Sequence, residues 1–188
     1  MSNMTMKYKV GAIIATPKGR IKILEYTPGK RLPHNNRIHP RATIKFIDSG
    51  WVCNVQTTNI SCGHINDCRA KTVYGVGYLD TDIKIPIRGT SIIRRAYDLW
   101  ANMLKRCYGG YKTCYEGCTV DVRWHSFKNF LNSIQELEGY DKWERGENMH
   151  LDKDIKVKGN KVYSADTCMF VTAHDNVEDQ LNRRWHKG

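Results

Sequence analysis

Two oxygen-bearing side chains near the C-terminal end, Asp152 and Asn176, have the chemistry to bind one metal ion together. Asp152 falls on an expected strand, and Asn176 falls early in an expected final helix. When a hairpin packs across such a helix, the two side chains can converge. A carboxylate and an amide oxygen suit a hard ion such as Mg²⁺ or Mn²⁺, which can bridge a scissile phosphate and stabilise the leaving oxygen. The alternative is structural: Asp152 pairs with a neighbouring lysine, and Asn176 caps a turn.

Side chains close to Asp152 could transfer a proton or bind a phosphate. His150 lies two residues earlier, so in a strand both residues point to the same face. His150 is therefore the better candidate for a general base and His174 is the second, with a surface histidine as the alternative for each. Lys153 follows Asp152 directly. Because a lysine is protonated at neutral pH, Lys153 would hold a phosphate, or act as a base only if burial strongly disfavoured its charge.

The elements that must position these residues form an expected ββα unit. Its parts are expected in the order strand, turn, strand and helix, at residues 150–155, 158–161, 162–163 and 172–184. Thr172 has the hydroxyl group that suits an N-cap. The hairpin followed by a helix is what brings Asp152 towards Asn176.

Two further helices are expected before this unit. The first begins at Ser91, an N-cap residue, and ends at Gly109 and Gly110. Its apolar residues recur at steps of three and four and share one face: Ile93, Tyr97, Trp100, Met103 or Leu104, and Cys107. A short strand at residues 119–122 and a second helix from about Ser126 to Leu137 follow.

The first half of the chain predicts a small antiparallel sheet or barrel. Alternating β-branched and aromatic residues indicate two hairpins, with strands at residues 8–14, 20–26, 42–47 and 51–55. Residues 69–90 contain too many glycines for regular structure and are expected to be a connector. The predicted fold is therefore α+β, with a basic β-rich domain at residues 1–85 and a helical plus ββα domain at residues 86–188.

Positive charge is concentrated in the first half of the chain. The 188 residues have a net charge of +11, and residues 1–90 contain 14 Lys and Arg against 5 Asp and Glu, a net of +9. This asymmetry is typical of a protein that binds a polyanion, and the expected partner is DNA or RNA. The alternative is a basic surface that only maintains solubility.

Eight basic residues are the expected nucleic-acid contacts. They are Lys18, Arg20, Lys22, Lys30, Arg31, Arg37, Arg41 and Lys161. Tyr26 or Trp51, which are close to the basic loop in sequence, could stack on a base.

The cysteine and hydropathy patterns argue against zinc and against a membrane protein. Cys62, His64 and Cys68 lie close together, as do Cys114 and Cys118, but neither group has the paired CxxC spacing usual for structural zinc. No apolar run approaches the roughly 18 residues of a membrane span, and the first residues lack the apolar run of a secretory signal. The sequence therefore predicts a cytoplasmic protein with reduced thiols and no zinc.

Residues 97–182 resemble a widespread group of phage and bacterial proteins labelled HNH endonucleases. The densest match consists of Leu151-Asp152-Lys153-Asp154-Ile155, Lys158-Gly159-Asn160-Lys161, Val162-Tyr163-Ser164, Thr167-Cys168 and Asn176. The stretches at residues 100–108 and 115–120 also match, and the basic front through residues 73–78 is similar to the companion region of such phage proteins.

The resemblance implies a metal-dependent DNA endonuclease with Asp152 and Asn176 as metal ligands. In active members the first strand ends in Asp-His or His-His, where one residue binds the metal and the other is the general base. Here the pair is Asp152-Lys153, and Thr167 stands where an Asn that orients the base is expected. The site is therefore degenerate.

Three hypotheses remain open. The first is an HNH-like endonuclease, and the second is a nucleic-acid-binding protein that kept the scaffold and lost cleavage. The third is a phage protein that binds a host protein through its basic front.

Overall fold

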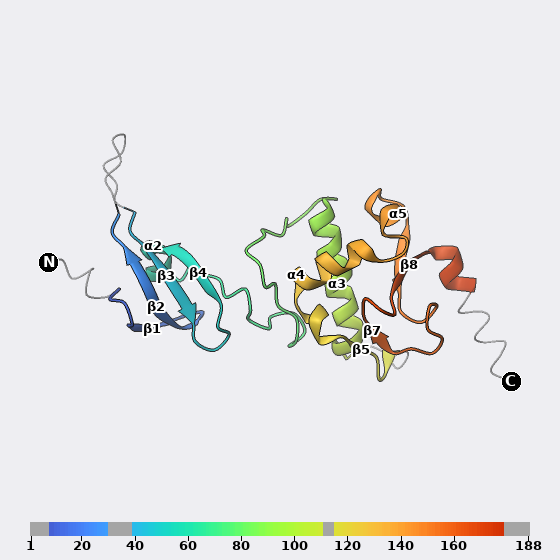
Figure 1. The fold of residues 1–188 in the computed structure, drawn as a ribbon, viewed down its shortest axis with the longest axis horizontal. Coiled ribbons are helices and arrows are strands. Elements are labelled where there is room, and N and C mark those ends of the chain that lie inside the picture. Colours follow the sequence, from blue (N-terminus) through green and yellow to red (C-terminus); the bar gives the residue numbers. More distant parts are fainter. Residues whose placement is uncertain (1–7, 30–38, 111–114, 179–188) are drawn as a thin grey trace. The chain divides into compact units, whose positions relative to one another are not determined.

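The computed structural model describes residues 8–29, 39–110 and 115–178. The chain divides into two compact units, Met1–Ala70 and Lys71–Gly188 (Figure 1). The first unit is a four-stranded antiparallel sheet, and the second contains helices followed by short strands and a helical segment. This confirms the α+β fold class expected from the sequence. Within the described residues, no helix has the length and apolar character needed to cross a membrane.

The four strands of the first unit pair in chain order, as two hairpins predict. They are β1 (Ile13–Thr16), β2 (Gly19–Thr27), β3 (Arg41–Phe46) and β4 (Val52–Gln56), and a short helix, α2 (Thr57–Ser61), follows. Each hairpin turn contains a glycine with a positive φ, +111° at Gly19 and +74° at Gly50, which a Cβ would disfavour. One face of the sheet covers a core made of Tyr8, Ile21, Ile23, Ala42, Ile44, Phe46, Ile60 and Ile65.

Strand β2 changes face part of the way along its length. Its register with β3 shifts between Ile23 and Glu25, where Leu24 is the extra residue of a β-bulge. A bulge reverses the alternation of side chains beyond it. Tyr26 therefore lies opposite the buried Ala42 and packs against the core. Regular alternation from Ile23 would have exposed this tyrosine on the other face.

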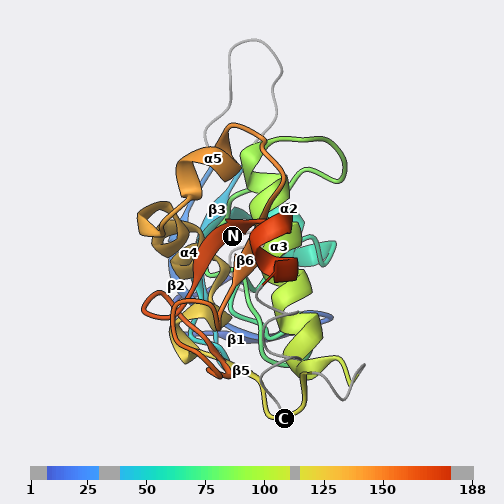
Figure 2. The same cartoon turned by 90° about the vertical axis from the view of Figure 1, so that its right-hand side faces the viewer.

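The second unit is organised around α3 (Ile92–Tyr108), which extends across most of it in both views (Figures 1 and 2). The Oγ of Ser91 accepts a hydrogen bond from the amide of Arg94 at 3.3 Å, which confirms the expected N-cap. The buried residues of the helix follow one face: Ala96, Trp100, Met103 and Leu104.

Shorter helical elements share one core with α3. They are η2 (Val122–His125), α4 (Phe127–Ser133), η3 (Ile134–Glu136) and α5 (Tyr140–Glu144). Within this core the Trp100 indole donates a hydrogen bond to the carbonyl oxygen of Trp124 at 2.7 Å. The expected second helix is thus present, but it changes to 3-10 geometry at Ile134, and α5 was not expected.

The segment before α3 belongs to the second unit. Val73, Val76, Leu79 and Ile85 pack against the core of that unit. The amide of Tyr78 donates to the carbonyl oxygen of His125 at 3.0 Å, and the carbonyl oxygen of Tyr78 accepts from the amide of Phe127 at 2.9 Å. The two units therefore divide after Ala70, whereas the sequence placed the boundary near residue 85.

The C-terminal strands pair differently from the expected hairpin. Strand β6 (Met149–Asp152) is antiparallel to β8 (Met169–Thr172), and β7 (Val162–Tyr163) is parallel to β5 (Thr119–Val120). The expected pairing of residues 150–155 with residues 162–163 is wrong. The order of two antiparallel strands and a helix still holds, because residues 173–178 are helical directly after β8.

The physical reason lies in the hydrogen bonds of the returning strand. One edge of β7 is occupied by β5, because the carbonyl oxygens of Lys161 and Tyr163 accept from amides of that segment at 2.9 Å. On the other edge, the carbonyl oxygen of Val162 accepts from the side chains of Asn160 at 2.7 Å and Thr167 at 2.8 Å, and the amide of Val162 donates to Oδ1 of Asn160 at 3.2 Å. These groups are not available to β6. The next apolar segment, β8, takes that place.

Candidate functional site

Asp152 lies at the end of β6, opposite Met169 of β8, and is half-buried. Its Oδ1 accepts hydrogen bonds from the amides of Asp154 at 2.8 Å and Ile155 at 2.7 Å. A carboxylate that binds amides two and three residues later bends the chain out of a strand. This explains why β6 ends at Asp152 and not near residue 155, and it fixes the orientation of the carboxylate.

The carboxyl groups of Asp152 and Asp154 interact with each other. Burial raises the pKa of Asp152 above its ordinary value of 3.8. The two backbone amides oppose this rise, and the negative charge and the side-chain hydrogen bond of Asp154 add to it. Two partly desolvated carboxylates in contact are an oxygen donor pair of the kind that suits a hard divalent cation.

Lys153 is buried, with 8% of its surface exposed, and it has a structural partner. Its Nζ lies 3.2 Å from Oδ2 of Asp154 and 5.6 Å from the centre of the Tyr163 ring. The arrangement therefore suits an ion pair that holds Asp154, and it does not suit proton abstraction by Lys153.

Asp152 and the helical segment that contains Asn176 lie at opposite ends of the paired strands β6 and β8. Asp152 pairs with Met169, whereas Thr172, from which the helical segment begins, pairs with Met149. Three residue steps along a strand correspond to about 10 Å. A shared ion thus requires the helical segment to run back along the sheet, and Asp154 is the oxygen donor that the structure places directly beside Asp152.

His150 is exposed on β6, opposite Val171. The next residue, Leu151, is buried. His150 therefore shares a strand face with Asp152, as the two-residue spacing predicts.

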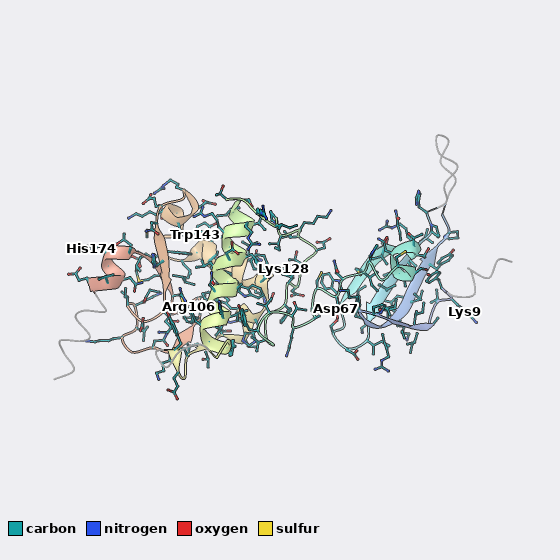
Figure 3. All side chains as sticks on the ribbon, turned by 180° about the vertical axis from the view of Figure 1, so that it is seen from behind. Lys9, Asp67, Arg106, Lys128, Trp143 and His174 are labelled. Atoms are coloured by element: carbon teal, nitrogen blue, oxygen red, sulfur yellow. The ribbon has the colours of Figure 1, made fainter. Side chains whose placement is uncertain are left out.

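The other histidine candidate lies in an exposed cluster. The ligand atoms of His174, Asp175 and Glu178 lie within 4.8 Å of one another, and all three residues are exposed. His174 is at the surface of the second unit (Figure 3). Asp175 already supports the N-cap at Thr172: its Oδ2 accepts from the Oγ1 of Thr172 at 2.8 Å and from the amide of Thr172 at 3.3 Å, and these hydrogen bonds lower the pKa of Asp175. Helix capping thus explains the position of Asp175, and His174 and Glu178 lie 3.8 Å apart at the i and i+4 positions of the same segment.

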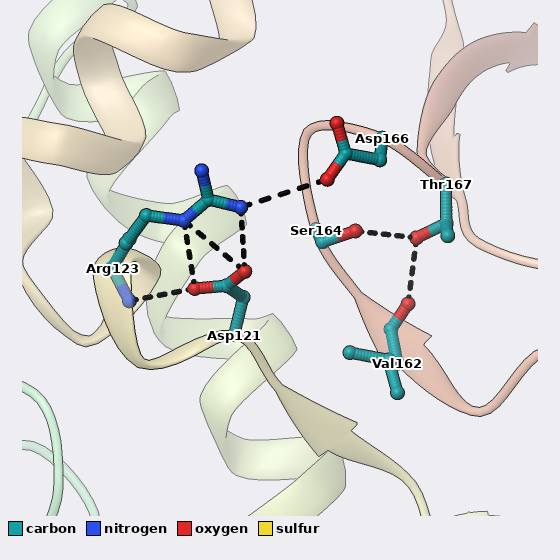
Figure 4. Close-up of polar contacts among 6 residues, drawn as sticks. All are labelled: Asp121, Arg123, Val162, Ser164, Asp166 and Thr167. Carbon is teal, nitrogen blue, oxygen red and sulfur yellow. Dashed lines mark hydrogen bonds and ion pairs between the residues drawn. The ribbon is translucent and has the colours of Figure 1, made fainter.

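Thr167 stabilises its own turn (Figure 4). Its Oγ1 donates to the carbonyl oxygen of Val162 at 2.8 Å and lies 2.9 Å from the Oγ of Ser164. The same loop is tied to η2, because Arg123 pairs with Asp121 at 2.7 Å and reaches Asp166 at 3.6 Å. Thr167 therefore has a structural role at the position where the resemblance expects an Asn.

The basic residues of the first unit occupy the open face of the sheet and its hairpin tip. Lys18, Arg20, Lys22 and Arg41 are exposed there. Arg20 lies 3.5 Å from Asp48. The predicted contacts Lys30, Arg31 and Arg37 lie outside the described residues.

The structure adds one exposed lysine to the expected nucleic-acid contacts and gives another lysine a structural partner. Lys45 is exposed and lies directly opposite Lys22, although sequence reasoning did not select it. Its position in the alternating run of β3 is the signal that could have identified it. Lys161 uses its Nζ to donate to the carbonyl oxygen of Glu116 at 3.1 Å, so its charge helps to hold a loop.

Cys62, His64 and Cys68, which are close in sequence, do not form a compact group of ligand atoms in the described part of the chain. There, His174, Asp175 and Glu178 are the one set of three such residues with ligand atoms within 4.8 Å of one another. Within the described residues, Cys62 and Cys68 form no disulfide, and Cys114 lies outside those residues.

Comparisons with protein-family models, with curated proteins and with solved structures found no match to this chain.

Proposed function

We propose that this protein binds nucleic acid and hydrolyses its phosphodiester bonds with a divalent metal ion held at Asp152. The observation that most supports this is the contact between the carboxyl groups of Asp152 and Asp154 in a partly buried position. Two carboxylates this close repel each other when both are charged. A divalent cation beside them would relieve that repulsion, so Mg²⁺ or Mn²⁺ is the ion that these donors suit.

Each side chain near β6 has one task in this proposal. Asp152 and Asp154 bind the ion, and Asn176 is the proposed ligand from the helical segment. His150 accepts the proton of the attacking water, and Lys153 holds Asp154 through their ion pair. When bound, the ion would stabilise negative charge on the phosphate and on the leaving oxygen.

The first unit supplies the affinity for the polyanion in this proposal. Residues 1–70 contain 11 Lys and Arg against 3 Asp and Glu, a net of +8, which favours binding to phosphates. The exposed residues Lys18, Arg20, Lys22 and Arg41 are the proposed contacts among those the structure describes.

A plasmid-nicking assay tests the proposal. Supercoiled plasmid is incubated with the protein in Mg²⁺, in Mn²⁺ and in EDTA, beside the variants Asp152→Asn, Asp154→Asn and His150→Ala. Asp166→Asn is the control, because the Asp166 side chain is 83% exposed and lies in a long, 3.6 Å ion-pair contact with Arg123. Metal-dependent nicking that Asp152→Asn abolishes and Asp166→Asn retains supports hydrolysis. Nicking that Asp152→Asn retains contradicts the proposed site.

A second function, binding without cleavage, is favoured by the environment of Lys153. Lys153 stands where active HNH enzymes have a histidine, and its buried ammonium group already pairs with Asp154. Plasmid binding without nicking in either metal would establish this function. A salt series distinguishes these two nucleic-acid functions from binding to a host protein, because binding driven by phosphates weakens steeply as the salt concentration increases.

A further inference from the structure

One row of side chains crosses all four strands on the open face of the sheet. Ile13 lies opposite Lys22, Lys22 opposite Lys45, and Lys45 opposite Val52. All four are exposed, and Ile13 and Val52 expose 62% and 45% of their surfaces. The centre of the open face is thus a pair of lysines between two aliphatic side chains.

The two lysines lie directly opposite each other on neighbouring strands. Cross-strand residues have Cβ atoms about 4.5–5.5 Å apart, and like charges in this position are destabilising. Within the described residues neither Lys22 nor Lys45 has an ion-pair partner. An anion between the two ammonium groups would turn this repulsion into attraction.

The other polar groups on this face already have partners. Thr43 donates to Glu25 at 3.1 Å, and Asn54 donates to Thr43 at 3.1 Å. Arg41 donates to the side-chain oxygen of Asn54 and, at 2.9 Å, to its carbonyl oxygen. Lys22 and Lys45 are therefore the groups best placed to meet a ligand.

The aromatic side chains of this unit are directed away from the open face. Among its described residues, Tyr8 and Phe46 are buried in the core, and Tyr26 and Trp51 pack against it. Proteins that hold single strands without sequence preference stack the bases on exposed aromatic rings. The open face of this sheet lacks such a platform in the part of the chain that the structure describes.

We infer that the open face, centred on Lys22 and Lys45, binds the phosphate backbone of duplex DNA without stacking on or selecting bases. The inference rests on the proposed nucleic-acid binding and specifies the surface and the form of the ligand. Lys22 and Lys45 contact phosphate, and Ile13 and Val52 pack beside the sugars. This contact does not depend on the DNA sequence, because the phosphate groups carry no information about the bases.

The test measures binding of the full chain by fluorescence anisotropy in EDTA, so that hydrolysis does not interfere. The probes are a labelled duplex, the same strand alone, and a second duplex of unrelated sequence. The variant Lys22→Met/Lys45→Met removes both charges from exposed positions, and Lys128→Met/Lys142→Met removes two exposed charges from the second unit. Lys22→Arg/Lys45→Arg keeps the charge.

Four results support the inference. Lys22→Met/Lys45→Met weakens duplex binding about tenfold at low salt and lowers the salt slope by about one to two. The arginine variant and the variant in the second unit bind within about twofold of the original chain. The two duplexes bind alike, and the single strand binds more weakly. Urea unfolding shows that the methionine variant is no less stable, since it loses a like-charge contact.

Three results would overturn it. The first is unchanged duplex binding by Lys22→Met/Lys45→Met, the second is tighter binding of the single strand, and the third is a strong preference between the two duplexes. Because the assay is independent of metal, a failure here leaves nicking at Asp152 to be decided separately by the plasmid assay.

Discussion

Gly77 lies directly against the indole ring of Trp100 and the side chain of Leu104. A Cβ added to Gly77 would be 2.9 Å from Cζ2 of Trp100 and 2.5 Å from Cδ1 of Leu104. Trp100 and Leu104 are fully buried in the core of the second unit. The glycine-rich segment is thus a packed part of this unit and not a free connector.

The variant Gly77→Ala is expected to destabilise the second unit. An added methyl group must displace one of two buried side chains, and overpacking of this kind costs about 1–3 kcal/mol. Urea unfolding followed by tryptophan fluorescence measures the change. Thr72→Ala, at an exposed position of the same segment, is the control and should leave the midpoint unchanged. Equal midpoints for Gly77→Ala and the original chain would contradict the packing described here.

Local patterns predicted much of the fold. The two hairpins of the first unit, the buried face of α3 and the N-caps at Ser91 and Thr172 depend on residues close together in the sequence. For such elements the spacing of apolar residues and a hydroxyl at the right position are sufficient signals.

Non-local competition explains what the sequence did not predict. Whether Val162 and Tyr163 pair with β6 or β5 depends on which backbone groups are free, and these lie more than 40 residues away at Thr119. The bulge at Leu24 is a second case, because one unpaired residue decides the face of Tyr26. At the candidate site, Asp152 and His150 follow from strand alternation, but the contact of Asp152 with Asp154 requires the turn after β6.

Lys153→Met is expected to destabilise the second unit by about 3 kcal/mol. The substitution keeps the length of the side chain but removes the positive charge that lies 3.2 Å from the half-buried carboxylate of Asp154. Breaking a buried ion pair on one side costs about 3–5 kcal/mol. Urea unfolding measures the loss, and Lys156→Met, at an exposed position, is the control. If Lys153 instead bound phosphate, stability would be retained and DNA affinity would fall.

The raised pKa of Asp152 predicts a dependence of stability on pH. The folded chain binds the proton of Asp152 more tightly than the unfolded chain does. The resulting gain in the free energy of unfolding is complete below pH 3.8 and is lost as pH rises through the higher pKa of the folded chain. Asp152→Asn keeps an oxygen for the two amides and removes the titration. Unfolding in EDTA between about pH 3.5 and 7 should therefore show that Asp152→Asn gains stability relative to the original chain as pH rises. A constant difference between the two across this range would contradict the buried position of Asp152.

A divalent metal ion bound at Asp152 should stabilise the folded chain at neutral pH, where the charged carboxylate alone does not. Binding to the folded chain alone stabilises it by about 1.4 kcal/mol at ten times the dissociation constant. Mn²⁺ or Mg²⁺ at pH 7 is therefore expected to raise the melting temperature of the original chain and of Asp166→Asn, and to have no effect on Asp152→Asn. An equal rise in all three chains would show that the ion binds elsewhere.

The bulge in β2 predicts that Tyr26 contributes to stability and not to DNA affinity. The ring of Tyr26 stacks on that of Tyr8, with centroids 6.5 Å apart and planes at 7°, on the core side of the sheet. Tyr26→Ala should lose this contact and the associated burial, about 1–3 kcal/mol. Leu24→Ala, at the exposed bulge position of the same strand, should cost much less. At a temperature where each variant remains folded, both should bind duplex and single strand as the original chain does. A selective loss of single-strand binding in Tyr26→Ala would place this ring against a base and contradict the face assigned to it by the bulge.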